Sequence, residues 1–497
     1  IMKIIVTGSS GLLGNKVYKV LSDNHDVGGF YLSKAVEGHR KLDITKYKDV
    51  VKMFTHISPD IIVHTASLSN ADFCESNKKK AKKINILGTY NIVKICKQKK
   101  AKLIFISSDY IFNGEPLSYF EDSNPHPINY YGHTKLEGER IVREELNNFA
   151  IIRPTILYGF NDEHDKPTFL SDTIKKLINS KPLSVDAHIK KYPLLIDDLA
   201  AFISKIIDED LKGIFHIKGK DKVTRYEWAL EIAKNAGFNK NLVKKYKSKN
   251  MATKPFDIDL KSKHKKLSRF KTVGIEKGIK IYNMQKGCVF KLLYSAKPDA
   301  SVMGQRVALF RIKVGQFLAE EHPVGADIVI PIPESGIFPA TGYANKLKKP
   351  LIFGVVRDYV TKRTLFTSNL KNRLSMVDSK LATIPDLIKG KKVVLIDEAI
   401  ISGTTLKVMA KKVRKAGARE IHVRIPSPFV TKPCFARMHP PKIKLIHHKL
   451  EKEGVRRPFE KLLSEYLEVE DVAFLSLENI KKAVDSCVKT RCFYCYE

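Results

Sequence analysis

Cysteine is scarce in this chain, which has 7 cysteines among 497 residues and a single tryptophan. A disulfide framework is therefore excluded, and the cysteines have to be interpreted as thiol, metal or cluster chemistry. Glycine and proline number only 27 and 22, which excludes a collagen-like or disordered chain. No apolar run approaches the roughly 20 residues of a membrane span, and IMKIIVTGSSG is typical of a strand and glycine turn rather than a signal peptide. We therefore expect a globular, cytoplasmic protein with no membrane partner.

Acidic residues are also few, because 53 Asp and Glu stand against 88 Lys and Arg and leave a net charge of +35. Such a charge favours anionic partners, either phosphorylated metabolites or nucleic acid. The basic excess is spread over both halves of the chain, and no nucleic-acid-binding motif accompanies it. We interpret it as a lysine-rich surface and expect no nucleic-acid partner. A nucleic-acid-binding protein is the alternative.

Short β-branched runs alternate with helical stretches in the first half, and the alternation restarts in the second half with ADIVIPIPESG and KKVVLIDEAIISGTT. This pattern predicts an α/β fold with parallel strands and crossover helices in each half. Between them, residues 239–286 are lysine-dense and weakly patterned, which predicts a peripheral segment and a linker. We expect two domains, at residues 1–284 and 287–497, and no repeat relates them.

The string TGSSGLLG follows the first predicted strand and opens a helix. Small residues at these positions let the backbone approach a pyrophosphate, whose charge the N-terminus of the helix stabilises. The alternative is a glycine turn with a purely structural role. We expect a dinucleotide cofactor to contact Gly8, Gly11, Leu12, Leu13 and Gly14.

The second predicted strand ends in GGFYLSK, which has no carboxylate for the ribose 2′-hydroxyl of NAD(H). Lys34 can instead meet a 2′-phosphate, so the sequence favours NADP(H) over NAD(H). Asp43 and the adjacent Ile44, in KLDIT, are candidates for the adenine side of the cofactor. A surface turn is the alternative for Asp43.

Tyr131 and Lys135, in YGHTK, lie four residues apart and therefore on one helical face. A lysine ammonium there would stabilise a tyrosinate and lower the phenol's pKa from near 10, which makes the tyrosine a general acid. Ser108, which closes the strand KLIFISS, would supply a hydroxyl to the same carbonyl oxygen from the carboxyl end of that strand. The alternative is that Tyr131 and Lys135 belong to an ordinary helix surface.

With TGSSGLLG, SSDYIFNG, YGHTKLEGE and RPTILYG, the first ~285 residues resemble the extended short-chain dehydrogenase/reductase family. The resemblance is nearest to dTDP-4-dehydrorhamnose reductase and to the regulatory β subunit of methionine adenosyltransferase. It implies a Rossmann fold, hydride transfer from NAD(P)H to a keto-sugar nucleotide, catalysis by Ser108, Tyr131 and Lys135, and a supporting Asn85. Ile156 replaces the tryptophan that the rhamnose-pathway enzymes usually show and resembles the regulatory relative.

In the second half, KKVVLIDEAIISGTT reads as a buried strand that ends in Asp397 and Glu398. A loop with Gly403, Thr404 and Thr405 follows and precedes a helix. Such a loop can surround a phosphate with backbone N–H groups and hydroxyls, while the paired acids accept hydrogen bonds from vicinal ribose hydroxyls. The alternative is an acidic turn with a threonine cap on the following helix.

The strings CVFKLLYSAKPDA, PIPESGIFPATGYA, VVLIDEAIISGTT and GAREIHVRIPSP resemble the phosphoribosyltransferase domain of amidophosphoribosyltransferase, which opens purine synthesis. This resemblance implies a type I phosphoribosyltransferase fold and binding of phosphoribosyl pyrophosphate (PRPP) with Mg²⁺ near the acids. By position, it assigns three parts of a site. The PRPP loop would consist of Asp397, Glu398, Ser402, Gly403, Thr404 and Thr405, and the pyrophosphate loop of Glu334, Ser335 and Gly336. The lid would consist of Arg357, Tyr359 and Arg363, flanked by Lys380.

The second half also departs from that family. Glu398, Ala399 and Ser402 stand where the PRPP loop ordinarily carries Asp, Ser and Arg, and Asp358 lies in a normally basic lid. The family's glutaminase domain has no counterpart, so the nitrogen should come from free ammonia or from a separate glutaminase.

Four cysteines, in GCVF, KPCF and RCFYC, stand where cluster-containing members of that family hold a [4Fe-4S] centre. Zinc is the rival occupant, because a two-residue spacer also suits tetrahedral thiolates. Free thiols are the third alternative. The four candidates are Cys288, Cys434, Cys492 and Cys495, and Cys487 has no matching role.

Together these motifs predict a bifunctional, homo-oligomeric enzyme. An NADP-dependent reductase of a keto-sugar nucleotide would be joined to a transferase that forms 5-phosphoribosylamine from PRPP and ammonia. Alternatively, the first half is a non-catalytic, NADP-binding regulatory module that controls the transferase half or a partner enzyme. A further alternative is that the chain joins two ordinarily separate proteins.

Overall fold

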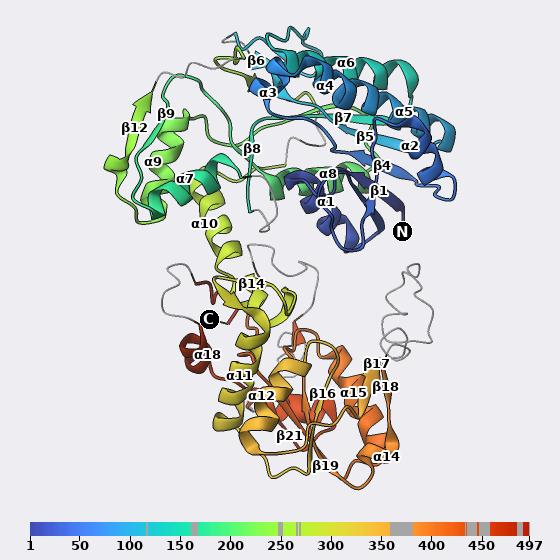
Figure 1. The fold of residues 1–497 in the computed structure, drawn as a ribbon, viewed down its shortest axis with the longest axis vertical. Coiled ribbons are helices and arrows are strands. Elements are labelled where there is room, and N and C mark those ends of the chain that lie inside the picture. Colours follow the sequence, from blue (N-terminus) through green and yellow to red (C-terminus); the bar gives the residue numbers. More distant parts are fainter. Residues whose placement is uncertain are drawn as a thin grey trace. The chain divides into compact units, whose positions relative to one another are not determined.

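The computed structural model of the chain describes all residues except 116–117, 161–166, 247–251, 265–266, 268–269, 358–380, 433, 435–444, 447–457, 485–490 and 497. The described residues fall into two compact units, Ile1–Tyr282 and Asn283–Glu497, each with its own sheet and core (Figure 1). No helix among these residues is both long and apolar enough to cross a bilayer.

A seven-stranded parallel sheet lies at the centre of the first unit (Figure 1). Its strands are, in spatial order, β11 (Gly213–Ile217), β7 (Phe149–Pro154), β5 (Lys102–Ile106), β4 (Ile61–His64), β1 (Lys3–Thr7), β2 (Asp26–Tyr31) and β3 (Arg40–Lys41). The direction in which strands are added reverses between β1 and β4. Open α/β sheets bind ligands beyond the carboxyl ends of their strands at such a reversal.

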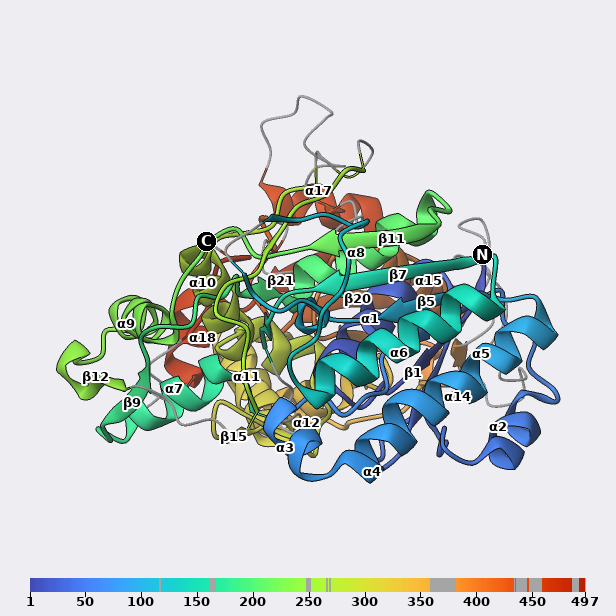
Figure 2. The same cartoon turned by 90° about the horizontal axis from the view of Figure 1, so that it is seen from above.

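Helices cover both faces of this sheet. Helices α1 (Leu12–Ser22) and α8 (Ile196–Asp208) bury Val17 and Ile203 in one core cluster with β-strand residues. Helices α2 (Tyr47–Phe54), α5 (Gly88–Lys99) and α6 (Tyr130–Glu145) bury Ile92 and Val142 in a second cluster. Helices α5 and α6 lie side by side (Figures 1 and 2). This three-layer arrangement confirms the predicted Rossmann-type fold.

Smaller elements extend the first unit beyond the carboxyl ends of its strands. They are α3 (Ala71–Ser76), α4 (Lys78–Ala81), a π-helical turn (Lys82–Leu87), α7 (Phe169–Ile178), α9 (Arg225–Asn235), and the pairs β6 (Ser118–Tyr119) with β13 (Asp259–Leu260), β8 (Leu157–Tyr158) with β10 (Leu194–Leu195), and β9 (Leu183–Asp186) with β12 (Val243–Tyr246).

The interpretation of residues 239–286 as peripheral segment and linker was wrong in part. Strands β12 and β13 belong to this stretch, and helix α10 (Ile275–Lys286) ends it. Ile275, Ile279 and Tyr282 are buried along that helix. The frequent lysines make this apolar face hard to recognise in the sequence. They are compatible with a helix because they can lie on its opposite face, in water.

A four-stranded parallel sheet lies at the centre of the second unit, in the order β16 (Ile328–Pro331), β19 (Lys392–Ile396), β20 (Glu420–Ile425) and β21 (Asp471–Phe474). Helices α11 (Val307–Glu321) and α12 (Ile337–Leu347) contribute Val314 and Tyr343 to one core cluster. Helices α15 (Thr404–Lys415) and α17 (Phe459–Leu467) contribute Met409 and Leu463 to the other. The α/β fold predicted for this half is confirmed.

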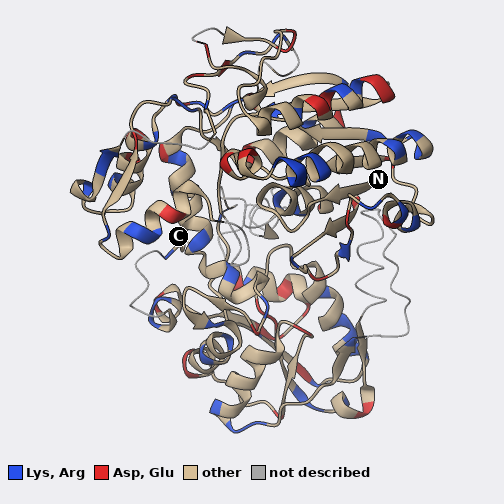
Figure 3. Ribbon diagram, turned by 45° about the horizontal axis from the view of Figure 1, so that its top comes forward, with Lys and Arg blue, Asp and Glu red and all other residues tan. Residues whose placement is uncertain are grey.

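The remaining described elements of the second unit are short. They are β14 (Ser301–Val302), β15 (Gln305–Arg306), a π-helical turn (Lys291–Ser295), β17 (Val355–Arg357), β18 (Leu381–Thr383), α14 (Pro385–Ile388) and α18 (Leu477–Ala483). Lysine and arginine are scattered over the helices of both units (Figure 3), which agrees with a basic excess that is not confined to one arm.

Candidate active sites

The glycine turn after β1 is tightly packed. Gly8 has a φ of +71°, and a Cβ atom there would lie 2.8 Å from the Ala66 backbone. A Cβ atom on Gly14 would lie 2.2 Å from the carbonyl oxygen of Gly8. Helix α1 begins directly after Gly11, which has no side chain to cap the first turn. The N–H groups of Leu12 and its neighbours are therefore suited to an anion such as a pyrophosphate.

The residues after β2 have mixed positions. Lys34 follows the strand and is half-buried. Asp43 Oδ1 accepts hydrogen bonds from the backbone N–H and the hydroxyl of Thr45, at 3.0 and 2.7 Å. Ile44 is buried, and its carbonyl oxygen accepts a hydrogen bond from Asn91. The Asp43 carboxylate therefore stabilises a turn, and its contact with a cofactor stays a prediction.

No sequence motif contains His39, which contacts the glycine turn. Its Nδ1 lies 2.7 Å from the Ser9 hydroxyl, and its ring centroid lies 4.2 Å from that of Tyr18. Burial, together with the charge of Lys19, lowers the pKa of His39. The imidazole therefore connects the glycine turn to the loop after β2, where the adenosine end of a dinucleotide would lie.

The structure brings Ser108 and Tyr131 together. Ser108 follows β5 and is buried, and its hydroxyl lies close enough to the Tyr131 side chain, on α6, to lower the pKa of that phenol. The Ser108 hydroxyl also lies 3.1 Å from Asp109 Oδ1 and accepts a hydrogen bond from the Tyr110 N–H at 3.2 Å. Lys135 is buried one turn after Tyr131, and its Nζ lies 4.3 Å from the Phe105 ring centroid.

The expected lowering of the phenol's pKa by Lys135 is not seen. Burial raises the pKa of Tyr131 above its ordinary value, and only the neighbouring Ser108 hydroxyl acts clearly against it. Burial also lowers the pKa of Lys135 to about 7. Both shifts have one physical reason, because burial disfavours the phenolate and the ammonium alike.

Asn85 lies in the π-helical turn and is 1% exposed. Its Oδ1 accepts a hydrogen bond from the Leu68 N–H at 2.8 Å, and its Nδ2 donates one to the Thr134 hydroxyl at 3.0 Å. Asn85 therefore joins the loop after β4 to the helix that carries Tyr131 and Lys135.

A buried acid and a buried lysine beside this site were not found from the sequence. Burial raises the pKa of Asp109, and the charge of Lys191 acts against that rise. Lys191 Nζ lies 4.6 Å from the Tyr110 ring centroid and donates a 3.4 Å hydrogen bond to the Pro255 carbonyl oxygen. Asp109 stood inside SSDYIFNG and could have been selected, whereas Lys191 belongs to no motif.

The second unit places an acid pair at the carboxyl end of β19. Asp397 and Glu398 are 8% and 7% exposed, and the Glu398 N–H donates a 3.0 Å hydrogen bond to Asp397 Oδ1. Burial, and then the charge of Glu398, hold the pKa of Asp397 well above its ordinary value. Ser335 donates a hydrogen bond to Glu398 Oε2. Hydrogen-bond donors or a cation beside two adjacent carboxyl groups stabilise their charged forms.

The loop after the acid pair ends at Gly403, which has a φ of +69°. Helix α15 begins at Thr404, and Gly403 at its N-cap leaves the first turn uncapped by a side chain. The Ser402 hydroxyl donates a 3.2 Å hydrogen bond to the hydroxyl of Thr404, and Thr405 follows in the same first turn. Backbone donors and hydroxyls therefore gather at one helix N-terminus, an arrangement that suits a phosphate.

The other residues assigned to this site by resemblance lie partly within the described structure. A Cβ atom on Gly336 would lie 2.4 Å from the carbonyl oxygen of Ile396, so this loop packs against the end of β19. Arg357 forms a 2.9 Å ion pair with Glu334. Three further candidates lie outside the described residues: Tyr359, Arg363 and Lys380.

The four candidate cysteines lie near one another. Cys288 and Cys492 are bridge partners, and the Cys492 N–H donates a 2.8 Å hydrogen bond to Gly287. Burial, together with the nearby Cys492 and Cys434 thiols, raises the pKa of Cys288 to about 12. Cys495 interacts with the same three thiols, and Cys487 lies outside the described residues. Within the described parts of the chain, no three His, Cys, Asp or Glu side chains are placed to hold a metal ion.

Two protein-family models match the chain. The RmlD substrate binding domain matches residues 2–274, and the phosphoribosyl transferase domain matches residues 310–426. Methionine adenosyltransferase 2 subunit beta of Xenopus laevis is 33% identical over 240 residues, which are 46% of this chain and 71% of the relative. A crystal structure of dTDP-4-dehydrorhamnose reductase from Bacillus anthracis with NADP is 28% identical, has a TM-score of 0.52, and aligns over 57% of this chain and 99% of that one.

The second half has its own relatives. Amidophosphoribosyltransferase of Methanocaldococcus jannaschii is 34% identical over 217 residues, which are 43% of this chain and 44% of the relative. The enzyme of that name from Rattus norvegicus is 36% identical over 203 residues, which are 38% of its length. This chain therefore spans less than half of either relative. It belongs to the RmlD substrate binding domain family through residues 2–274 and carries a phosphoribosyl transferase domain in its second unit.

Proposed function

We propose that the chain is a bifunctional enzyme. Its first unit reduces a keto-sugar nucleotide with NADPH, and its second unit forms 5-phosphoribosylamine and pyrophosphate from PRPP and ammonia. One observation carries the proposal: each unit brings together site residues that are distant in sequence, Ser108 with Tyr131 and Ser335 with Glu398. The named relatives, a sugar-nucleotide reductase and amidophosphoribosyltransferases, support both halves.

In the reductase half, NADPH would supply the hydride when bound, and the tight turn of Gly8 and Gly14 fits its pyrophosphate. Tyr131 would donate its phenolic proton to the carbonyl oxygen, so that the ketone becomes an alcohol. Ser108 lies beside Tyr131 and would donate a hydrogen bond to the same oxygen. A protonated Lys135 would stabilise the phenolate as it forms, although burial lowers the pKa of this lysine to about 7 and its charge has no effect on the Tyr131 pKa in this structure. The relative bound to NADP, with the absence of a carboxylate in GGFYLSK, supports NADP(H) rather than NAD(H).

A regulatory first unit is the second candidate function. Relatives of the first unit include a subunit of methionine adenosyltransferase 2, and Ile156 stands where rhamnose-pathway reductases usually show tryptophan. Under this alternative the unit binds NADP without turnover and controls the second unit or a partner enzyme. Purified protein, NADPH and a panel of 4-keto-sugar nucleotides separate the two, because tight dinucleotide binding without NADPH oxidation supports only the regulatory module.

In the transferase half, the Gly403 loop would hold the 5-phosphate of PRPP through backbone N–H groups and the hydroxyls of Thr404 and Thr405. Asp397 and Glu398 would accept hydrogen bonds from the two ribose hydroxyls. Cleavage of the bond between C1 and pyrophosphate leaves positive character on the sugar, and ammonia then forms the new C1–N bond. The loop of Glu334 and Ser335 would contact the departing pyrophosphate.

Mg²⁺ would serve to neutralise the pyrophosphate. Asp397 and Glu398 supply only two carboxylates, so the ion would arrive with the substrate rather than be held by a protein cage.

For the cysteines we propose a [4Fe-4S] cluster, with zinc or free thiols as alternatives. The mutual influence of the Cys288, Cys434, Cys492 and Cys495 thiols supports it, although the described side chains are not placed to hold a metal ion as they stand, and iron and sulfide analysis of protein purified without oxygen tests it.

The proposal is tested by PRPP consumption on the full chain purified without oxygen. Turnover with ammonia is expected, because neither of the two matched domains, at residues 2–274 and 310–426, is a glutaminase. Turnover with added glutaminase and glutamine would support a separate subunit as the nitrogen source. If PRPP is consumed with neither ammonia nor glutamine, the transferase assignment is contradicted.

A further inference from the structure

Three segments of the first unit hold the imidazole of His39 against the glycine turn. Its Nδ1 lies 2.7 Å from the Ser9 hydroxyl, and its ring centroid lies 4.2 Å from that of Tyr18 on α1. Strand β2 contributes Gly29, where a Cβ atom would lie only 2.4 Å from His39 Nδ1. The absence of a side chain at Gly29 therefore leaves the space that the imidazole occupies.

The backbone around His39 fixes this position. The His39 N–H donates a 3.1 Å hydrogen bond to the Val36 carbonyl oxygen, and Gly38 lies inside this turn with a φ of +77°. Ser9 is fully buried, and its N–H donates a 2.9 Å hydrogen bond to the carbonyl oxygen of Phe30 in β2. The ring is thus held where the glycine turn and the segment after β2 meet.

This position matters for a dinucleotide. In a Rossmann-type fold the pyrophosphate lies at the glycine turn, and residues after the second strand meet the 2′-position of the adenosine ribose. His39 belongs to the second of these segments and contacts Ser9 in the first. The side chain is half-buried, so the protein does not enclose the ring completely. A group at the ribose 2′-position would therefore lie beside the imidazole.

The charge of His39 depends on what lies beside it. Burial, and then the charge of Lys19, lower the pKa of His39 below 6.5, so the imidazole is mostly neutral at pH 7. A phosphate acts in the opposite direction, because an anion favours the protonated ring. In that form both ring nitrogens donate, one to Ser9 and one to a phosphate oxygen. The other titratable or charged groups around the ring are Tyr18 on α1 and, on its own segment, Lys34, Glu37 and Arg40.

We infer that His39, in its protonated form, binds the 2′-phosphate of NADP(H), so that the first unit takes up a proton from solvent with this cofactor and none with NAD(H). The ribose hydroxyl that NAD(H) carries at this position has no charge to hold a second proton on the ring. The inference rests on the proposed dinucleotide site and adds to it a residue that distinguishes the two cofactors.

The test is calorimetric titration of NADPH and of NADH into the full chain and into His39→Gln, between pH 6.5 and pH 8.5. Titrations in HEPES and in Tris, which differ in ionisation enthalpy, measure the protons taken up. The free 2′-phosphate contributes little, because its second pKa is about 6 and it is mostly a dianion in this range.

In the unmodified chain we expect proton uptake with NADPH only. Its NADPH affinity should fall as the pH rises, because His39 is neutral with and without cofactor once the pH exceeds the raised value in the complex. In His39→Gln we expect no uptake and, at pH 6.5, roughly tenfold or weaker NADPH binding, through loss of one charge-assisted hydrogen bond. NADH binding should be the same in both proteins.

Two further variants serve as controls. His56→Gln removes an exposed imidazole that precedes β4, at the opposite edge of the sheet, and should bind both dinucleotides like the unmodified chain. His39→Arg places a permanent cation in the same position, and we expect it to retain NADPH binding without proton uptake. Thermal melts of each variant check that it is folded.

The outcomes separate this inference from the proposed function. NADPH binding without proton uptake, equal weakening of both dinucleotides in His39→Gln, or tighter binding of NADH than of NADPH would overturn the role of His39 and leave the dinucleotide site in place. If the unmodified chain binds neither dinucleotide, the site itself is contradicted, and this inference with it.

Discussion

Ser335 donates a hydrogen bond to Glu398, although 63 positions separate the two residues in the chain. Ser335 lies in the loop before α12, and Glu398 follows β19, so the contact joins the carboxyl ends of two neighbouring strands. The proposed contacts to pyrophosphate and to the ribose hydroxyls thereby meet at one edge of the sheet. This is the edge at which parallel α/β sheets bind ligands.

Substituting Asp397 by Asn should reduce PRPP turnover by at least about a hundredfold, because the variant loses a charge that would act on the ribose in the transition state. Initial rates of pyrophosphate release measure this. Asp386→Asn is the control, since Asp386 is an exposed carboxylate of the same unit, on α14. Full activity of the Asp397 variant would refute the assignment of that carboxylate.

Substituting Tyr131 by Phe should lower keto-sugar reduction by roughly 10²- to 10⁴-fold, the usual contribution of a general acid. NADPH binding should be unchanged, because the substitution removes one hydroxyl at a buried position and leaves the glycine turn intact. Stopped-flow oxidation of NADPH and fluorescence titration of the cofactor measure the two effects. If the variant reduces substrate at the normal rate, Tyr131 is not the proton donor.

A methyl group at Gly14 should weaken dinucleotide binding. The Cβ atom of Gly14→Ala would lie 2.2 Å from the Gly8 carbonyl oxygen, so the turn must shift, at a cost of about 1–3 kcal/mol. NADPH titration should show roughly tenfold or greater loss of affinity. The matched control is Gly38→Ala, where no atom lies within 4 Å, although its φ of +77° adds some strain. Equal affinity of both variants would argue against pyrophosphate at this turn.

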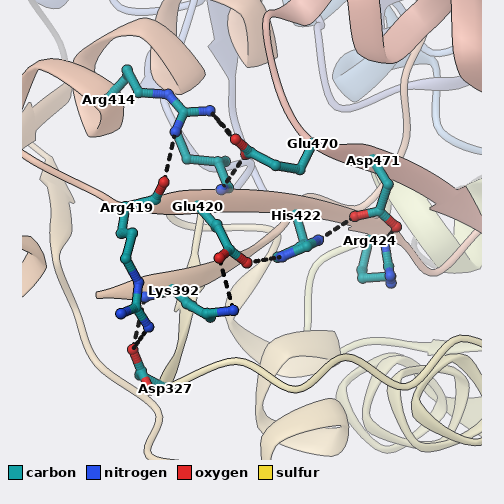
Figure 4. A network of polar contacts seen from close by, with 10 residues as sticks. Asp327, Lys392, Arg414, Arg419, Glu420, His422, Arg424, Glu470 and Asp471 are labelled. Carbon is teal, nitrogen blue, oxygen red and sulfur yellow. Dashed lines mark hydrogen bonds and ion pairs between the residues drawn. The ribbon is translucent and has the colours of Figure 1, made fainter. Parts of the chain in front are cut away.

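The stability of the second unit should depend on pH through a polar network at the amino ends of its strands (Figure 4). The hydrogen bond to Asp471 raises the pKa of His422 above 6.5. Burial alone would raise the pKa of Asp471, but His422 and Arg424 outweigh it and lower this pKa below 3.8. A raised histidine pKa stabilises the fold below pH 6.5, and that stabilisation is lost as the pH rises through the folded value. The aspartate's contribution is present above pH 3.8 and is lost as the pH falls through its lowered pKa.

The pair should therefore stabilise the unit most between about pH 4 and pH 6.5. Urea unfolding of the chain and of His422→Gln, followed across this range, measures it. We expect the difference in unfolding free energy between the two proteins to shrink above pH 6.5 as His422 loses its proton. A difference that does not vary with pH would mean that the charge on His422 contributes nothing.

Sequence reasoning predicted those parts of the candidate sites that are local in the chain. The Gly8 turn and the Asp397 to Thr405 loop each follow a strand and open a helix within a few residues, so spacing alone indicates their geometry. The sequence did not indicate Lys191 and His39, because these residues contact Tyr110 and Ser9 only in the tertiary fold.

Burial explains the remaining differences. Helical spacing correctly predicted that Tyr131 and Lys135 share a face of α6, yet it carries no information on how deeply that face is covered. Depth decides the pKa values, and here it raises that of Tyr131 and lowers that of Lys135. The helix at Ile275–Lys286 was not predicted, because its lysines obscure the spacing of its buried isoleucines in the sequence.

Calorimetric titration of the magnesium salt of PRPP into the full chain tests the transferase assignment most directly. We predict saturable heat with one site per chain in the unmodified protein, and strongly weakened binding in the Asp397→Asn variant but not in Asp386→Asn. The absence of heat in the unmodified protein, or equal binding in all three proteins, would contradict the assignment of the Asp397 to Thr405 loop to this donor.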